Sequence, residues 1–209
     1  PAPEKPAQSN PLENIKQEAL RCEKILKGLL GFAKAPNPLK TLININSLLK
    51  EILELIAYQP ALKNIAITQH LQSDLPVVEA DPEQLKQVFL NIIINAVQAM
   101  PNGGELAAST SFERANYETP NLKEIDERQI ICQTRDNGCL HISFSDTGCG
   151  IHPSHLKHIF EPFFTTKSYE QGTGLGLSIS YSIIEQFGGT IKVQSQLNQG
   201  STFTIVLPV

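Results

Sequence analysis

The sequence predicts an α/β protein, a two-layer sandwich of a mixed sheet and helices, preceded by one long bundle-type helix. After residue 38, segments of strand-like alternation and segments of helical period follow one another irregularly, which favours a mixed sheet. Before it, a heptad pattern favours a helix that packs on another helix. The 209 residues, 41% hydrophobic and 18% charged, suffice for one core and an appendage.

The N-terminal segment is divided by its composition. Residues 1–9 are rich in proline and polar residues and are predicted to be a linker or loop. Asn10 and Pro11 then suit the cap and first position of a helix over 10–35. Its apolar residues fall three and four apart, at Leu12, Ile15, Ala19, Cys22, Leu26, Leu29 and Ala33. One helix cannot bury such a stripe alone, so a partner helix is expected.

Two further helices are predicted in the first half of the remaining chain. Ser47 is expected to cap a helix that carries apolar residues from Leu48 to Ile56. A short alternating strand follows at about 65–69. The tetrapeptide Asp81-Pro82-Glu83-Gln84 has the spacing of a capping box and starts the next helix, which should end at Asn102-Gly103-Gly104.

The second half is predicted to be mostly strand. A strand is expected at about 105–112, followed by a polar loop insertion at 113–128. Two strands should flank Asp136-Asn137-Gly138, a hairpin signal. A helix over about 173–187 ends at Gly188-Gly189. Strands at 190–196 and 201–207 close the chain.

Composition limits the partners of this chain. A net charge of −4 is too small to indicate nucleic acid or a membrane surface, and no apolar run is long enough to cross a bilayer. The four cysteines have no CxxC spacing, so reduced thiols in a cytoplasmic protein are expected. Because the first residue, Pro1, is not Met, we expect the chain to be a fragment. The sequence leaves open whether the parent protein is anchored in a membrane.

Two asparagines lie four residues apart in the segment 87–96. Asn91 and Asn95 therefore share one helix face, which is otherwise apolar. An unpaired buried amide costs about 1–3 kcal/mol, so both need partners. Phosphate oxygens and a hydrated Mg²⁺ would supply them. A solvated or helix-capping pair is the alternative, and the pair alone does not decide between the two.

Asp146 stands at the end of an apolar strand and begins Asp146-Thr147-Gly148-Cys149-Gly150-Ile151. Its carboxylate can accept a hydrogen bond from a base amino group, and the two glycines let the backbone approach a planar ring closely. A plain turn is the alternative. The segment 136–138 lacks a second glycine and falls at a predicted hairpin tip, so Asp146 is the preferred candidate.

An aromatic loop follows, Phe160-Glu161-Pro162-Phe163-Phe164-Thr165-Thr166-Lys167. Its aromatic residues fit a hinge beneath a mobile lid. They fit equally well a loop that is pinned into the core by its aromatic rings. Lys167 either reaches a phosphate or is a solvated charge.

A glycine-rich segment, Gly172-Thr173-Gly174-Leu175-Gly176-Leu177, runs into the helix predicted after it. Free N–H groups and the positive end of the helix dipole suit a polyphosphate there. No Gly-Lys-Ser/Thr follows, so the segment is not a Walker motif. By itself it is weak evidence.

The order of the four segments is far more specific than any one of them. Over about residues 40–209 the sequence resembles the catalytic, ATP-binding domain of bacterial sensor histidine kinases, in the Bergerat-type ATPase superfamily. The likeness is closest to the nitrogen-regulatory type, and the segments look like the N, G1, F and G2 boxes. The first helix resembles the second helix of the dimerisation and phosphoacceptor hairpin. The implied domains are a linker (1–9), that helix (10–37) and the catalytic domain (38–209).

The resemblance implies roles for individual residues. Asn95 would bind Mg²⁺, Asp146 would hold the adenine amino group, and catalysis would rest on Asn91, Asn95 and Lys167. The implied partners are the phosphoacceptor helix of the same kinase, in cis or in a dimer, and a response-regulator receiver domain. The residues implied to bind ATP are Asn91, Asn95, Asp146, Gly148, Gly150, Ile151, Phe164, Lys167, Gly172, Thr173, Gly174, Leu175, Gly176 and Leu177.

The sequence departs from this family in three places. No His-Glu/Asp-x-x-x-Pro box is present, so the acceptor histidine is expected outside the chain. Gln98 stands near a place where the family often has a basic residue, which leaves phosphate contact from that side open. The stretch 113–137 is longer than usual and is assigned no role.

Three other functions remain open. An ATP-operated clamp of the gyrase or heat-shock type would need a glutamate near Asn91 to activate water, and asparagine cannot act as a general base. A protein-serine kinase of the same superfamily is disfavoured by the heptad helix. A non-catalytic dimerisation or receiver-binding module need not keep intact glycine segments.

Overall fold

The computed structural model describes residues 19, 39–57, 62, 64–114, 138–167 and 172–209. The predicted linker, the predicted first helix apart from Ala19, and most of the predicted insertion lie outside these residues. So does the first strand of the hairpin predicted around 136–138. All structural statements below concern the described part of the chain.

A mixed five-stranded sheet forms one layer of the molecule. Its spatial order is β2 (Ile65–Leu71), β4 (Gly104–Glu113), β5 (Cys139–Asp146), β7 (Gly200–Pro208) and β6 (Thr190–Gln196). β2 pairs with β4 in parallel, and the other three pairings are antiparallel. A separate two-stranded sheet pairs β1 (Thr41–Ile43) with β3 (Val78–Ala80).

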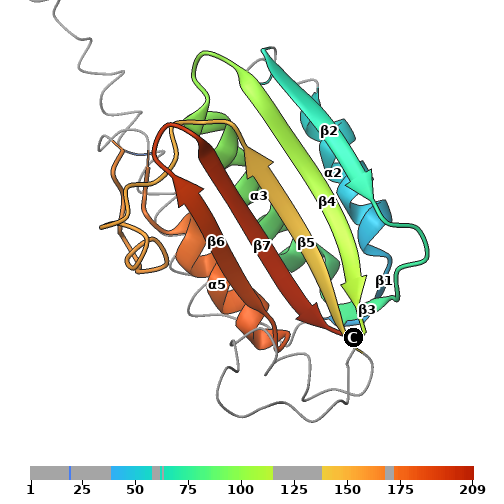
Figure 1. Cartoon of the computed structure of the whole chain (residues 1–209). Coiled ribbons are helices and arrows are strands. Elements are labelled where there is room, and N and C mark those ends of the chain that lie inside the picture. The colour runs from blue at the N-terminus through green and yellow to red at the C-terminus, as the bar shows by residue number, and fades with distance from the viewer. Residues whose placement is uncertain (1–18, 20–38, 58–61, 63, 115–137, 168–171) are drawn as a thin grey trace, which may run out of the picture.

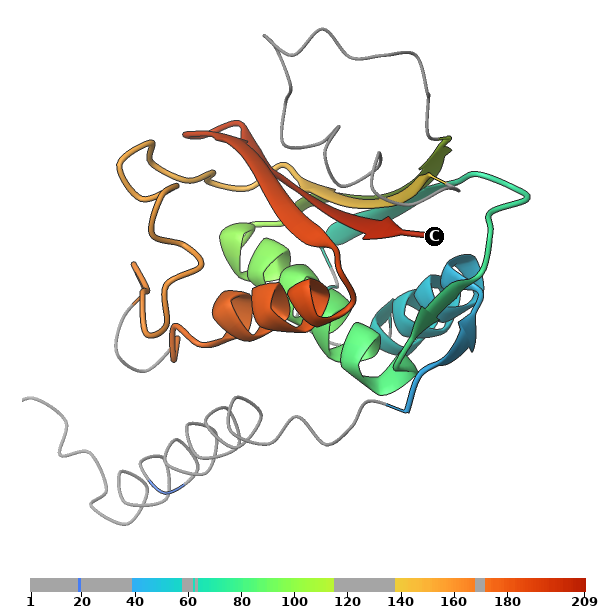
Figure 2. The same cartoon turned by 90° about the horizontal axis from the view of Figure 1, so that it is seen from below.

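Three helices form the second layer. Figures 1 and 2 show α2 (Ile45–Ala57), α3 (Pro82–Ala99) and α5 (Gly176–Gln186) on one face of the five-stranded sheet, with α3 in the middle. Alternate residues of β5 bury their side chains against this layer, and the rings of Phe89 and Phe144 lie 5.6 Å apart across it. The predicted two-layer sandwich with a mixed sheet is confirmed.

The start of α3 is fixed as predicted. Asp81 Oδ1 accepts hydrogen bonds from the backbone N–H groups of Glu83 (3.0 Å) and Gln84 (3.2 Å), and Pro82 occupies the first turn. These bonds satisfy N–H groups that have no partner within the helix. The position of every side chain on α3 therefore follows from a local signal in the sequence.

The start of α2 differs from the prediction. The helix begins at Ile45, and Asn44 Oδ1 accepts from the N–H of Ser47 at 3.0 Å. Asn44 is therefore the cap, and Ser47 provides the capped amide. Asparagine and serine are both favourable N-cap residues. Because the buried Ile45 belongs to the helix, the cap is Asn44, the residue before it.

Two other predictions need correction. α5 begins at Gly176 and not at 173, because Gly174 has φ = +67°, which a right-handed helix does not allow. Reduced thiols were expected throughout, but Cys139 is disulfide-bonded, whereas Cys149 is a free thiol.

Among the described residues, no helix is both long and apolar enough to cross a membrane.

Candidate functional site

One stripe of α3 joins the predicted motif segments. Asn91, Asn95 and Ala99 follow one another at intervals of four residues, so they lie along one side of the helix. Each meets a different segment of the chain. Figure 2 shows the loop after β5 beside the C-terminal end of α3 and the N-terminal end of α5.

Asn91 lies against the start of α5. Its Nδ2 donates to the carbonyl oxygen of Gly176 and to Ser180 Oγ, both at 3.2 Å. Ser180 is completely buried, and its hydroxyl donates to the same carbonyl at 2.9 Å. Ser180 was not among the predicted site residues. The available signal was a serine one helical turn after Gly176, a spacing that occurs by chance too often to stand out.

Asn95 faces the aromatic loop. Its Oδ1 accepts a hydrogen bond from Lys167 Nζ at 3.2 Å, and the same ammonium group contacts Gln98 Oε1. Lys167 therefore reaches α3 from a distant part of the sequence. The contact brings together two residues predicted for the site, and their catalytic and metal-binding roles stay predictions.

Ala99 meets the segment after β5. Its carbonyl oxygen accepts from the N–H of Cys149 at 3.1 Å. A Cβ atom at Gly148 would lie 2.7 Å from both the Cβ and the carbonyl oxygen of Ala99, closer than side chains approach. In the structure, the absence of a side chain at Gly148 lets the end of α3 approach closely, and its expected place beside a planar ring stays a prediction.

Asp146 is a buried carboxylate, with 5% of its surface exposed. Its Oδ1 accepts from the N–H of Gly148 at 2.8 Å. Burial raises the pKa of Asp146, and the backbone N–H groups of Gly148 and Ser201 partly oppose the rise. Such a carboxylate gains more from a hydrogen-bond donor than one in water does, because the surrounding dielectric is low.

The aromatic loop and the glycine-rich segment are held together by their backbones. The N–H of Phe163 donates to the carbonyl oxygen of Gly174 at 2.9 Å. Phe164 packs against the core, with its ring 5.7 Å from that of His155, whereas Phe163 is 58% exposed. The loop is pinned by Phe164, which agrees with the second of the two expectations for it.

The other predicted residues occupy two environments. Gly150, Ile151, Gly172 and Thr173 are half-buried at the surface of this region, and the N–H of Ile151 donates to Ser195 Oγ at 2.8 Å. Leu175 is buried in the core and Leu177 packs against it. These two leucines therefore anchor the start of α5, and the buried Leu175 has only its backbone groups left to serve a ligand.

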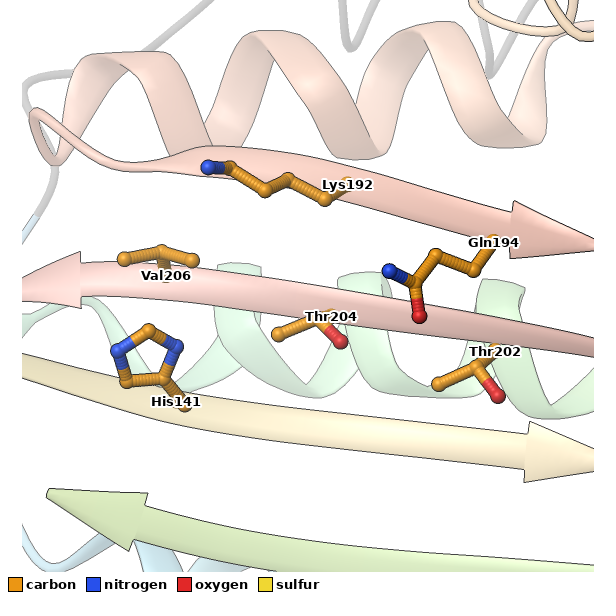
Figure 3. Close-up of a pocket in the computed structure, with 6 residues that line it drawn as sticks. All are labelled: His141, Lys192, Gln194, Thr202, Thr204 and Val206. Atoms are coloured by element: carbon orange, nitrogen blue, oxygen red, sulfur yellow. The ribbon is translucent and has the colours of Figure 1, made fainter. Parts of the chain in front are cut away.

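Two hollows lie on the sheet. One, of about 320 Å³, is next to Asp146 at the end of β5 and along the β6–β7 hairpin. The other, of about 100 Å³, is drawn in Figure 3 and contains none of the predicted site residues. It is lined by side chains of β5, β6 and β7: His141, Lys192, Gln194, Thr202, Thr204 and Val206. His141 Nε2 there lies 3.3 Å from Glu113 Oε2.

One family of known proteins matches more than half of this chain. Residues 80–209 match the family described as histidine kinase-, DNA gyrase B-, and HSP90-like ATPase. The chain belongs to this family. It is 34% identical over 195 residues to sporulation kinase E of Bacillus subtilis (strain 168), covering 93% of this chain and 23% of that protein. It is homologous to the ATP-binding catalytic domains of sensor histidine kinases.

Solved structures of histidine kinases have the same fold. Full-length ShkA in complex with AMPPNP matches with a TM-score of 0.70 and 26% identity, covering 99% of this chain and 40% of that one. ThkA in complex with the response regulator TrrA matches with a TM-score of 0.66 and 26% identity, covering 99% and 53%. The chain spans less than two thirds of each of these proteins.

Proposed function

We propose that this chain binds Mg·ATP where the four motif segments meet and transfers the γ-phosphate to a histidine outside the chain. The observation that supports this most is the stripe on α3. Asn91, Asn95 and Ala99 contact the glycine-rich segment, the aromatic loop and the Asp146 loop in turn. A family member with all its motif segments around one helix has the parts that nucleotide binding needs.

The adenine end of the site is assigned to Asp146. Its buried carboxylate can accept a hydrogen bond from the adenine amino group, and its raised pKa reflects a poorly hydrated position. Gly148 and Gly150 shape the loop beside it, together with Ile151. The hydrogen bond then forms in a low dielectric, where it discriminates well between bases.

The phosphate end is assigned to the other three segments. Lys167 supplies a donor, Asn91 holds the start of α5 beside the site, and residues 172–176 lead into the N-terminus of α5, an 11-residue helix whose dipole favours anions. Phosphoryl transfer depends mainly on such positioning and on charge neutralisation. The contact of Lys167 with Asn95 supports a position of the aromatic loop, with Phe164 and Lys167, next to the nucleotide.

Asn95 is the proposed magnesium ligand. Its Oδ1 already faces a cation, the Lys167 ammonium group at 3.2 Å, so this oxygen is oriented toward positive charge. Mg²⁺ keeps several waters and uses few protein oxygens, which suits a site where the described residues contain no cluster of three His, Cys, Asp or Glu. When bound, Mg²⁺ would neutralise part of the phosphate charge.

The proposed partners follow from the relatives. ThkA is seen with a response regulator, and a receiver domain is therefore a proposed partner here. We also propose that residues 10–37 form the second helix of a phosphoacceptor hairpin, that 38–209 form the catalytic domain, and that the protein acts in the cytoplasm. The water-activating glutamate of a clamp-type ATPase is absent at Asn91, which disfavours that alternative.

The first test is a titration with AMPPNP by calorimetry, with and without Mg²⁺. Wild type should bind with Mg²⁺, and Asn95→Ala should lose roughly tenfold or more in affinity, since a hydrogen bond or ligand to a charged group is lost. Gln87→Ala, exposed on the same helix, is the matched control. Equal affinity with and without Mg²⁺ in wild type would refute the metal role of Asn95.

The second test addresses phosphoryl transfer. Labelled ATP is incubated with this chain and a purified hairpin that carries an acceptor histidine. Acid-labile, alkali-stable label on the hairpin identifies phosphohistidine, whereas acid-stable label would indicate a serine kinase. Phosphate release without any labelled protein would favour the clamp-type ATPase.

A further inference from the structure

We propose that Gln98 is a positioning residue for Lys167, so that the aromatic loop supplies the positive charge that α3 itself lacks. The inference rests on the proposed function, which places Lys167 at the phosphates. It gives a role to Gln98, which lies in the last turn of α3. The positive charge comes from Lys167 in the aromatic loop, and Gln98 determines where its ammonium group lies.

The contact is made by two neutral oxygens. Lys167 Nζ donates to Asn95 Oδ1 at 3.2 Å and contacts Gln98 Oε1. Residues three apart on a helix are neighbours, so Asn95 and Gln98 form a pair of acceptors on one side of α3. An ammonium group has three donors and no acceptor, and two amide oxygens suit it well. Neither of these two amide oxygens carries a negative charge, so phosphate oxygens can compete with them for the lysine.

The end of α3 also favours a cation. The carbonyl groups of the last helical turn carry partial negative charge, and basic side chains are favoured there. α3 has no basic residue in its last turn. Lys167 approaches this turn from the aromatic loop and occupies the position that a basic residue of the helix would otherwise take.

The backbone and the stem of Lys167 also have neighbours of their own. Its backbone N–H donates to Thr165 Oγ1 at 3.1 Å. A Cβ atom at Gly172 would lie 3.5 Å from the lysine Cβ and 3.6 Å from its Cδ, so the stem runs along the glycine-rich segment. Among the described residues, the side-chain acceptors that the ammonium group contacts are Asn95 and Gln98, and we propose that Gln98 contributes to its direction.

The first experiment tests the contact without any nucleotide. The full chain is pulse-labelled with an amine-acetylating reagent, and the rate at Lys167 is measured by mass spectrometry against exposed Lys50. In Gln98→Leu the Lys167 rate should rise roughly two- to tenfold, because a lost hydrogen bond is worth that factor. Gln87→Leu, the same change at an exposed position of α3, should leave it unchanged. An unchanged rate in Gln98→Leu overturns the proposal.

The second experiment tests the consequence for binding. The Kd of Mg·AMPPNP is measured for wild type, Gln98→Leu, Lys167→Met and the double variant. Gln98→Leu should weaken binding about three- to tenfold in wild type and have little further effect when Lys167 is already replaced. A purely structural role of Gln98 predicts the same loss in both backgrounds, and that result, or no loss in wild type, overturns the proposal.

The two proposals fail in different ways. If wild type does not bind AMPPNP, the proposed function falls, and with it the role of Gln98 in binding. If wild type binds and the double-variant cycle shows no coupling, only the inference about Gln98 falls. Thermal unfolding of each variant, compared with Gln87→Leu, separates a misfolded chain from one that has lost this contact.

Discussion

Asp146 combines a stability cost with a proposed function at a single residue. Its carboxylate is buried next to the C-terminal end of β5, where burial raises its pKa, and only backbone N–H groups oppose that rise. Burying a charge lowers the stability of the fold unless hydrogen bonds compensate for it, so stability alone does not favour a carboxylate at this position. The adenine amino group is the donor that we propose for its remaining acceptor capacity.

Replacing Asp146 by asparagine should separate these two effects. The folded state binds the proton more tightly than the unfolded state, so wild-type stability falls as pH rises from the ordinary pKa of 3.8 through the raised value. The amide of the variant cannot titrate, so Asp146→Asn should gain in Tm relative to wild type as pH increases and show no gain below that window. AMPPNP affinity should fall about tenfold.

The measurement is thermal unfolding of both proteins across a pH series. Asp74→Asn is the control, since Asp74 is exposed and its φ of 59° is one that asparagine also tolerates. A difference in Tm between Asp146→Asn and wild type that does not change with pH would contradict the argument.

At the scale of elements, the sequence predicts those helix and strand boundaries that depend on interactions between neighbouring residues. The start of α3 was predictable because Asp81 and Pro82 act within one turn. The start of α5 was not, because no local signal marks the positive φ of Gly174, whose carbonyl oxygen accepts from the N–H of Phe163 in the aromatic loop. β1 and β3 have three residues each, too few for an alternating pattern.

Two glycines of the same segment should respond differently to alanine. At Gly174, φ is +67° and a Cβ would lie 2.3 Å from the Phe163 carbonyl carbon. At Gly176 the nearest atom, Asn91 Cγ, is 3.6 Å away, an ordinary contact. Gly174→Ala should therefore cost about 1–3 kcal/mol of unfolding free energy. Gly176→Ala should be neutral or stabilising by up to about 1 kcal/mol.

Urea unfolding of the two variants checks this difference. An equal loss in both would mean that the close approach of Gly174 to the aromatic loop is absent in solution. Loss of AMPPNP binding in Gly174→Ala, measured without urea at a temperature where the variant remains folded, is expected as well, since the phosphate segment would be displaced.

At the scale of the whole molecule, the site depends on a core that the sequence predicted well. The helical and alternating patterns identified the layers, and the order of the four segments led to the site residues that we propose. The partners within the site were not predictable, because they pair residues far apart in the chain. Asn91 with Ser180 and Lys167 with Gln98 are separated by 89 and 69 residues.

A pair of leucines tests how far the layers depend on this core. Leu85 of α3 is completely buried, whereas Leu55 of α2 is 67% exposed. Leu85→Ala should cost about 2–5 kcal/mol in unfolding free energy, from lost burial and the cavity left behind. Leu55→Ala makes the same change on a helix surface and should stay within about 0.5 kcal/mol. Comparable losses in urea unfolding would mean that α2 is covered by another surface in solution.

The stripe on α3 has a geometric consequence for any molecule that spans it. Each step of four residues advances about 6 Å along the axis and overshoots a full turn by about 40°. Asn91, Asn95 and Ala99 therefore ascend a shallow spiral, about 12 Å long and turned through about 80°. An elongated molecule that touches all three loops has to curve around the helix, and a straight one of the same length would lose contact at one end.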